Sequence, residues 1–530
     1  MGSFKIRKIL LLDGVDAICA TKLEAAGLEV TIKPKLSKDD LLKEIQNYEG
    51  VVVRSATQIT AEVLAAGTRL QMVGRAGVGT DNIDVDAATR RGVLVMNTPT
   101  GNTISAAEHT CALICSLGRC LPQACESLKG GVWDRKKFMG NELYGKTLAI
   151  IGLGRIGREV AHRMQAFNMT CIGYDPFVSA AAAAEWNIEA LPLDEIWPRA
   201  DYITVHTPLL PHTRNLLGEE VLMTKCKPGV KVVNVARGGI VDEAALLRAL
   251  EAGRCGGAGL DVFTTEPPTD YALCRHPKVV CTPHLGASTF EAQERVAEEL
   301  ADQMVSAVSG GPIAGLVNGG ALATANSSDA QPWLALASAL GQVAEVIVSG
   351  PLTSVTLVPA GAFANKNLAN ALCSAVLAGL LKRSSSGTAN LINSCVLAQD
   401  SNISCEIVPP SDELKPILPS GVDNGLLVAV SGANSNVKLV GSSANGLPLL
   451  YSVNDSSWPI AVPLSRSLVL YRSLAASSPL PAIAATLVKG GLLSLASSAG
   501  GLWHVATLDS PVTELDAKVQ DVEYVGQVSL

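Results

Sequence analysis

A glycine-rich turn near residue 150 has the spacing of a dinucleotide phosphate site. Gly152, Gly154 and Gly157 follow the apolar run 147–151 and precede a helical pattern at 158–165. Gly152 permits a tight strand-to-helix turn, Gly154 lets a pyrophosphate approach the backbone, and Gly157 allows close packing of helix on sheet. The helix N-terminus adds N–H groups and partial positive charge. The sequence therefore predicts that a dinucleotide binds here.

Asp175 ends the next predicted strand, about 20 residues after the glycines, as this type of site requires. A carboxylate at this position accepts hydrogen bonds from ribose hydroxyls and repels a 2′-phosphate. This favours NAD over NADP as the cofactor. The alternative interpretation of Asp175 is an ordinary turn residue at a strand end.

Arg237, Glu266 and His284 each follow one of three successive apolar strands, on the side of the sheet where ligands bind in this fold. A histidine can take the hydroxyl proton of an alcohol while the C2 hydride departs. A neighbouring carboxylate would orient the ring and raise its pKa. A guanidinium can bind the substrate carboxylate through two hydrogen bonds. The set indicates hydride transfer to and from a 2-hydroxy acid, although each residue alone has a purely structural alternative.

The elements around these residues indicate an α/β protein. Short apolar strands alternate with helical patterns such as 38–45 and 61–66, which is typical of parallel sheets covered on both faces. A buried helix is expected at 105–118 and an amphipathic helix at 291–308. The predicted strands are 8–12, 29–32, 51–53, 72–74 and 94–96, then 147–151, 170–174, 202–205, 230–234, 258–261 and 279–282. We predict two doubly wound parallel-sheet domains with a cleft between them.

The last 200 residues have a different composition, rich in Ala, Ser, Gly and Leu. Residues 310–329 are predicted to be a linker. Helices are expected at 333–347 and 368–383, and strands and turns from 400 to 460. From residue 467 the order strand–helix–strand–strand–helix–strand is expected, and its first five elements are 467–471, 480–488, 492–498, 503–508 and 511–519. The predicted C-terminal region is therefore α+β.

Composition narrows the functional classes. The net charge is −7, and nothing in the composition suggests a nucleic-acid partner, which would need a basic face. No apolar run reaches the roughly 18–20 residues that span a bilayer. The 13 cysteines are expected to be thiols that act as small apolar residues. Cys111, Cys115, Cys120 and Cys125 are interpreted as helix cysteines rather than as a zinc site, and no metal is predicted.

Segments 152–157, 234–239, 261–268 and 283–288 resemble those of the D-isomer-specific 2-hydroxyacid dehydrogenases. The resemblance extends from residue 1 to about residue 318, and it implies that Arg237, Glu266 and His284 are the catalytic set. Further segments are similar to the long animal members of the family: 53–57, 73–77, 97–102, 133–140 and 206–211.

The resemblance also implies binding residues. Arg54, Arg75 and Gly77 would bind the substrate, although exposed charge at a strand end is the alternative for both arginines. At 78 the family often has Thr, so Val78 could contact the cofactor through its backbone only. The NAD contacts implied are Val78, Gly152, Gly154, Arg155, Ile156, Gly157, Asp175, Thr207, Val235, Ala236, Asp261, Leu285, Gly286 and Ala287, with Asp261 orienting the nicotinamide amide.

By the same resemblance, residues 1–99 with 286–315 would bind substrate and 100–285 would bind NAD. Residues 316–460 would form an intervening regulatory-type domain and 461–530 an ACT-like domain. The implied reaction is NAD-dependent oxidation of 3-phosphoglycerate, the first step of serine biosynthesis, by a cytosolic homotetramer. Two alternatives remain: a glyoxylate or hydroxypyruvate reductase, and a nucleotide-sensing corepressor. The 200-residue tail argues against both.

Overall fold

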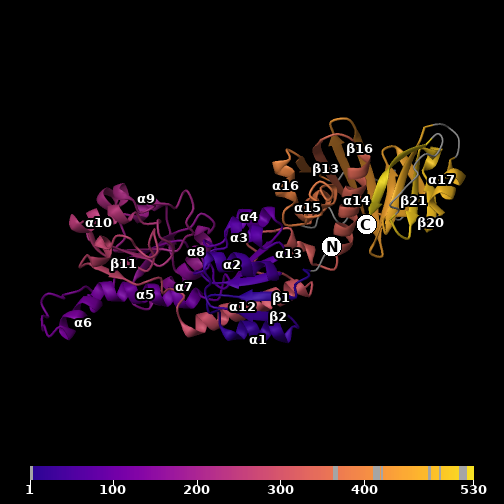
Figure 1. The fold of residues 1–530 in the computed structure, drawn as a ribbon. Coiled ribbons are helices and arrows are strands. Elements are labelled where there is room, and N and C mark those ends of the chain that lie inside the picture. Colours follow the sequence, from indigo (N-terminus) through magenta and orange to yellow (C-terminus); the bar gives the residue numbers. More distant parts are fainter. Residues whose placement is uncertain are drawn as a thin grey trace. The chain divides into compact units, whose positions relative to one another are not determined.

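The computed structural model describes residues 4–361, 368–409, 418, 422–474, 479–488, 491–511 and 522–530. Its described strands form four sheets (Figure 1). The chain divides into two compact units, one of Thr98–Glu299 and the other of Met1–Asn97 with Leu300–Leu530. The prediction of two parallel α/β sheets followed by an α+β region is confirmed.

The first sheet has five parallel strands in the order β2-β1-β3-β4-β5. Its central strand β3 is a run of apolar residues that is buried along its whole length. The connecting helices begin at side-chain caps, as when Ser37 accepts a hydrogen bond from the Asp40 N–H. The elements are β1 (Lys8–Leu11), α1 (Ala17–Ala25), β2 (Glu29–Ile32), α2 (Lys38–Glu44), β3 (Gly50–Val53), α3 (Ala61–Ala66), β4 (Met72–Arg75), α4 (Val85–Arg90) and β5 (Leu94–Asn97).

The second sheet has seven parallel strands in the order β12-β11-β10-β9-β6-β7-β8. Two apolar clusters use residues from its central strands, so the sheet is covered on both faces. Six strands were predicted; the seventh, β8, has only two residues, too few to show a hydrophobic pattern. The strands are β6 (Thr147–Ile151), β7 (Thr170–Tyr174), β8 (Glu189–Ala190), β9 (Tyr202–Val205), β10 (Val230–Asn234), β11 (Cys255–Leu260) and β12 (Val279–Cys281).

The helices of this second unit are α5 (Thr103–Arg119), α6 (Leu121–Lys129), α7 (Arg155–Gln165), α8 (Ala180–Glu185), α9 (Leu193–Ile196), α10 (Glu243–Glu251), α11 (Ala272–Arg275) and the start of α12 (Phe290–Val308). Four of them, α7, α8, α10 and α11, connect strands that are neighbours in the sheet (Figure 1). The later part of α12 packs on the first sheet, where a Cβ at Gly74 would lie 3.1 Å from a Leu300 methyl carbon.

Residues 310–329 differ from the predicted linker because they pack against the edge strand β5. Leu316 forms a bridge with Met96. The buried Asn318 accepts a hydrogen bond from the Val95 N–H at 2.8 Å and donates one to the Val93 carbonyl at 2.9 Å. A short helix, α13 (Leu322–Ala325), follows. The small polar residues of this segment predicted a linker. Instead, the Asn318 side chain hydrogen-bonds backbone N–H and C=O groups at the edge of the sheet.

The third sheet has six strands in the order β14-β13-β15-β16-β17-β18, mostly antiparallel. Its helices α14 and α15 pack closely through glycines: a Cβ at Gly341 would lie 2.2 Å from the Val376 carbonyl oxygen. The elements are α14 (Gln331–Ile347), β13 (Leu352–Ala360), α15 (Ala369–Leu380), α16 (Ser394–Asp400), β14 (Ser404–Ile407), β15 (Gly425–Gly432), β16 (Asn436–Ala444), β17 (Leu447–Val453) and β18 (Ser456–Pro463).

The fourth sheet is antiparallel in the order β20-β21-β19-β22. The predicted order of strand, helix, strand and strand is present, and a final strand closes the sheet. Of the helix expected at 511–519, residues 512–519 lie outside the described residues. The elements are β19 (Ser467–Ser473), α17 (Leu480–Leu487), β20 (Leu492–Ser497), β21 (Trp503–Leu508) and β22 (Val522–Ser529).

The cysteines differ from expectation at one pair, because Cys373 and Cys405 are joined in a disulfide. The other 11 cysteines are free. Within the described ranges no helix is both long and apolar enough to cross a membrane. Over the same residues no group of three or more His, Cys, Asp or Glu side chains is placed to hold a metal ion.

Candidate active site

The three glycines of the turn between β6 and α7 occupy three different environments. Gly152 has a φ of 101°, and a Cβ there would lie 2.5 Å from the His206 carbonyl oxygen. A Cβ at Gly157 would lie 2.1 Å from the Gly152 carbonyl oxygen. Gly154, in contrast, faces open space, with nothing within 4 Å of an added Cβ. The turn therefore packs tightly on one side and leaves its backbone open on the other.

The open side of the turn has the features that NAD would require. The first-turn N–H groups of α7 have no acceptor within the helix. The Thr207 hydroxyl is buried without a hydrogen-bond partner among the described residues. Its methyl carbon would lie 3.0 Å from a Cβ at Gly152, so this orphan hydroxyl lies beside the turn. A dinucleotide phosphate would satisfy these donors, so the residues present fit the cofactor.

Asp175, which follows β7, holds this turn. One carboxylate oxygen accepts a hydrogen bond from the Leu153 N–H at 2.9 Å, and the other accepts one from the Phe177 N–H at 2.9 Å. Each oxygen keeps a second lone pair, because a carboxylate has about four acceptor positions. The ribose assignment of Asp175 stays a prediction, and the turn contact is an additional role.

His284 and Glu266 form the central pair of the site. The imidazole Nδ1 lies 2.7 Å from a Glu266 carboxylate oxygen, and the other oxygen accepts the Phe263 N–H at 3.0 Å. Both side chains are part-exposed, 45% for His284 and 37% for Glu266. Nδ1 is thereby turned toward the carboxylate, which leaves Nε2 as the nitrogen available to a substrate.

The pair shifts both pKa values in the direction of an ion pair. The hydrogen bond that His284 donates to Glu266 raises the pKa of His284; burial and the positive charge of Arg237 oppose that rise without cancelling it. Burial alone would raise the pKa of Glu266, but its hydrogen bonds with His284 and the Phe263 N–H outweigh burial and lower it. Glu266 is therefore ionised at neutral pH, and neutral His284 carries its proton on Nδ1.

Arg237 belongs to the same cluster. Its guanidinium is close enough to lower the pKa of His284 by charge repulsion. The loop is held by the Asn234 side chain, which donates to the Arg237 carbonyl at 2.8 Å. Gly238 lies against the segment that leads to Glu266, since a Cβ there would lie 1.9 Å from the Phe263 carbonyl oxygen. The structure thus brings the three predicted catalytic side chains together at the carboxyl ends of β10, β11 and β12.

A buried network beneath His284 was not found from the sequence. The Asp261 carboxylate, which is fully buried, accepts hydrogen bonds from the Thr282 hydroxyl at 2.6 Å and from the Leu285 and Gly286 N–H groups at 2.6 and 2.8 Å. His109 of α5 lies 2.9 Å from the Thr282 hydroxyl and 3.2 Å from Asp261. Burial would raise the pKa of Asp261, but the hydrogen bonds from His109 and Thr282 outweigh it.

This network fixes the backbone that carries His284. The His284 N–H donates to the Asp261 carbonyl at 2.8 Å, and His284 has a φ of 56°, in the left-handed region. Non-glycine residues adopt that conformation at a cost, so surrounding contacts must hold it. His109 and Thr282 carried no sequence signal, because one lies in an ordinary buried helix pattern and the other at a strand end.

The remaining predicted cofactor residues lie at the same end of the second sheet. Arg155 and Ile156 begin α7, and Val235 with Ala236 follows β10. Leu285, Gly286 and Ala287 follow His284, and a Cβ at Gly286 would lie 2.9 Å from a Val235 methyl carbon. These positions are consistent with a cofactor site, and each individual contact stays a prediction.

The predicted substrate residues form a second cluster, in the first sheet. Arg54 follows β3, and Arg75 is the last residue of the neighbouring strand β4. Asn82 connects them: its amide donates to the Arg54 carbonyl at 2.8 Å, and its oxygen accepts from the Arg75 guanidinium at 3.1 Å. Asp13 accepts the Arg54 N–H at 3.0 Å. Asn82 and Asp13 were not predicted from the sequence.

Gly77 and Val78 continue from this cluster. Gly77 has a φ of 142°, a backbone conformation that L side chains rarely adopt, so another residue there would be strained. The Val78 carbonyl accepts a hydrogen bond from the Asn97 side chain at 2.6 Å. The Val78 carbonyl is thus occupied within its own unit, whereas its predicted contact with the cofactor stays a prediction.

Comparison with known proteins identifies the family to which the chain belongs. Residues 111–286 match the NAD-binding domain of D-isomer specific 2-hydroxyacid dehydrogenases, and residues 329–415 match the D-3-phosphoglycerate dehydrogenase intervening domain. The chain belongs to the D-isomer-specific 2-hydroxyacid dehydrogenase family. D-3-phosphoglycerate dehydrogenases from Rattus norvegicus and Homo sapiens are 47% and 46% identical to it, each over 98% of both chains.

A solved structure gives the same result for the first part of the chain. D-lactate dehydrogenase from Aquifex aeolicus, complexed with NAD and lactic acid, has a TM-score of 0.51 and 30% sequence identity. The match covers 57% of this chain and 96% of that one. The chain is therefore an NAD-dependent oxidoreductase of this family with an additional C-terminal region.

Proposed function

We propose that this chain catalyses the NAD-dependent oxidation of 3-phospho-D-glycerate to 3-phosphohydroxypyruvate, the first step of L-serine biosynthesis. The observation that carries the chemistry is the 2.7 Å contact between His284 Nδ1 and Glu266, with Arg237 beside it. The substrate assignment is supported by relatives with the name D-3-phosphoglycerate dehydrogenase along nearly the whole chain.

His284 acts as the base in this proposal. Its Nδ1 proton is held by ionised Glu266, so Nε2 carries the lone pair that accepts the hydroxyl proton of the substrate. NAD, held at the open side of the Gly152–Gly157 turn beside Thr207, would supply the acceptor for the C2 hydride. Glu266 stabilises the imidazolium as it forms, and Arg237 binds the substrate carboxylate and polarises the C2 oxygen. In the reverse direction the imidazolium returns the proton.

We also assign Arg54 and Arg75 to the anionic ends of the substrate, with Gly77 beside them. Their support is the shared strand-end position and the link through Asn82. Residues 1–99 with 286–315 are then the substrate-binding domain and 100–285 the NAD-binding domain. Residues 461–530 are proposed to be ACT-like, because helix α17 follows β19 and the sheet order is β20-β21-β19-β22.

The function is tested by following NADH absorbance with purified full-length protein, NAD and 3-phosphoglycerate. We expect turnover with 3-phosphoglycerate and NAD, and much less with NADP, because Asp175 would repel its 2′-phosphate. Glyoxylate with NADH is the control for the alternative reductase. Faster turnover of glyoxylate would contradict the substrate assignment, and absence of any turnover would favour a binding protein.

Replacing Glu266 with Gln should move the pH profile to lower pH. The wild-type carboxylate raises the pKa of His284 above its ordinary value of about 6.5. Without Glu266, burial is the largest remaining influence and lowers the pKa of His284; Arg237 also lowers it, and the charge of Asp261 opposes both. Because oxidation needs neutral His284, the rising limb of kcat/KM against pH should shift to lower pH while the maximal rate falls. An unshifted limb would show that His284 is not the titrating base.

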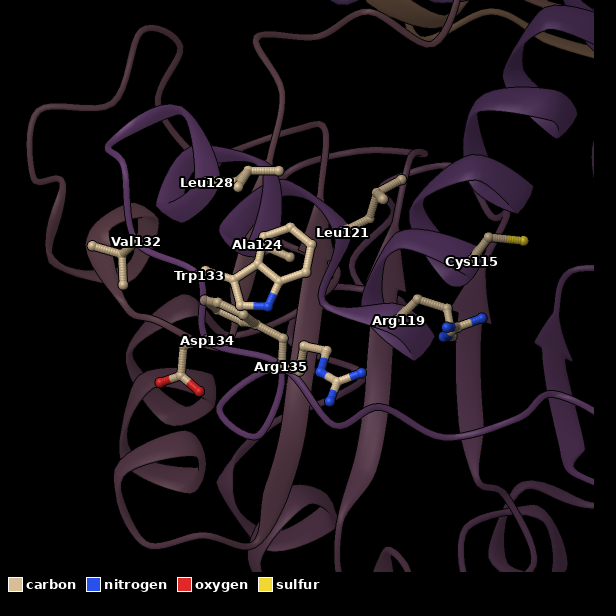
Figure 2. A pocket seen from close by; sticks show the side chains of 10 residues that line it. Cys115, Arg119, Leu121, Ala124, Leu128, Val132, Trp133, Asp134 and Arg135 are labelled. Carbon is tan, nitrogen blue, oxygen red and sulfur yellow. The ribbon is translucent and has the colours of Figure 1, made fainter.

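A cytosolic homotetramer is also part of the proposal. The segment of α6 and the loop 130–140, here the α6 arm, has no buried residue in its helix, and Trp133 is 77% exposed. Trp133, Leu128 and Arg135 are among the residues that line an open pocket of about 560 Å³. Figure 2 shows their side chains. Contiguous exposed apolar side chains usually mark an interaction site. A second copy of the chain would cover this surface.

Sedimentation of the full-length protein tests the assembly. We expect a mass of four chains for the wild type and a smaller species for Trp133→Asp, because a carboxylate in an apolar interface is costly. A monomeric wild type, or a Trp133→Asp variant with unchanged mass, would contradict the role of the α6 arm.

A further inference from the structure

Two thiols lie together at the edge of the second sheet, close in sequence to the catalytic histidine. Cys281 is the last residue of β12, and Cys274 lies in α11. The Cys281 thiol donates to the Cys274 carbonyl oxygen at 3.8 Å, and it lies close enough to the Cys274 thiol to raise the pKa of that thiol. The chain between them is a tight turn, in which the Val279 N–H donates to the His276 carbonyl at 2.9 Å.

The two thiols differ in access to solvent. Cys281 is exposed and Cys274 is half-buried. Burial, with a further contribution from the Cys281 thiol, raises the pKa of Cys274 to about 11, so Cys274 is protonated at neutral pH. The exposed thiol is the one that a reagent in solution reaches first. Among the free cysteines that the structure describes, the other exposed thiol is Cys125, on α6.

We propose that Cys274 and Cys281 are a redox site that forms a reversible disulfide with a low-molecular-weight disulfide as oxidant. The Cys281 thiolate attacks one sulfur of the oxidant, forming a mixed disulfide and releasing one thiol. Cys274 then loses its proton and attacks the Cys281 sulfur, and the departing thiolate takes up a proton as it leaves as the second thiol. The protein loses two hydrogens and two electrons, and the oxidant gains both as it becomes two thiols.

The bond would act on the active site through the next residue. Thr282 follows Cys281 directly, and its hydroxyl donates to Asp261, which in turn binds the Leu285 and Gly286 N–H groups. A disulfide ties the end of β12 to α11 and alters this support for His284. We infer that oxidation lowers kcat. This effect on turnover rests on the proposed function, whereas formation of the bond does not.

The test uses the full-length enzyme with oxidised glutathione, followed by mass spectrometry and the NADH assay. The wild type should lose two hydrogens in a cross-linked peptide containing Cys274 and Cys281. Its kcat should fall roughly tenfold or more, since small displacements near the chemistry are costly. Dithiothreitol should restore both the mass and the rate.

Three variants separate the steps. Cys274→Ser should keep a stable glutathione adduct on Cys281, because the resolving thiol is absent. Cys281→Ser should form neither the cross-link nor an adduct at Cys274 and should keep its kcat in oxidised glutathione. Cys125→Ser, the matched control, should behave as the wild type. An unlinked wild type, or one that retains glutathione on Cys281, would overturn the redox site. A cross-linked wild type with unchanged kcat would overturn its control of turnover.

Discussion

Replacing His284 with alanine should lower kcat for oxidation by roughly 10²–10⁴-fold, the usual contribution of a positioned general base. The loss follows from geometry. Glu266 contacts Nδ1 of His284, so the lone pair on Nε2 is the one that remains available to the substrate. The measurement is steady-state NADH formation at saturating 3-phosphoglycerate, across a range of pH.

NAD affinity should change little in the same variant, because the glycine turn and Thr207 lie at other strand ends. His162→Ala is the matched control, since His162 is an exposed histidine near the end of α7. If His284→Ala retained near-normal turnover, the assignment of the base would be wrong. If it lost NAD binding as well, the histidine would be structural instead.

Six of the seven strands of the second sheet could be predicted, because each is marked by its own run of apolar residues. The predicted bounds of β6, β7, β9 and β10 agree residue for residue with the structure. Each is an apolar run between polar turns, buried on both faces. Once parallel strands are assigned, their carboxyl ends share one edge, so the proximity of Arg237, Glu266 and His284 follows from topology.

The supporting contacts could not be predicted, because they depend on which distant residues the packing brings together. His109 meets Asp261 across 152 residues of chain, and nothing local to α5 distinguishes it from a buried helix histidine. Asn82 and Asn318 donate to backbone carbonyls. Every residue has such a carbonyl, so the sequence does not indicate which one an asparagine will bind. A domain boundary is equally hard to predict. Helix α12 is one unbroken helical pattern, yet its first part belongs to one unit and its later part to the other.

Replacing Arg237 with alanine should lower kcat/KM by roughly 10²–10³-fold, as for loss of a donor that stabilises developing charge. Arg237→Lys should restore only part of the lost kcat/KM, because an ammonium group lacks the planar arrangement of N–H donors with which a guanidinium binds both oxygens of a carboxylate. The matching substrate test uses an analogue without the C1 carboxylate. The wild type and Arg237→Ala should have similar kcat/KM values for this analogue.

The pH profile gives Arg237 a second, independent signature. Its positive charge lowers the pKa of His284, so its removal should raise that pKa and move the rising limb of kcat/KM to higher pH. Glu266→Gln should move the same limb in the opposite direction. Opposite shifts require both charged groups to act on one titrating imidazole. Shifts of the same sign, or none, would mean that the three side chains do not work as one site.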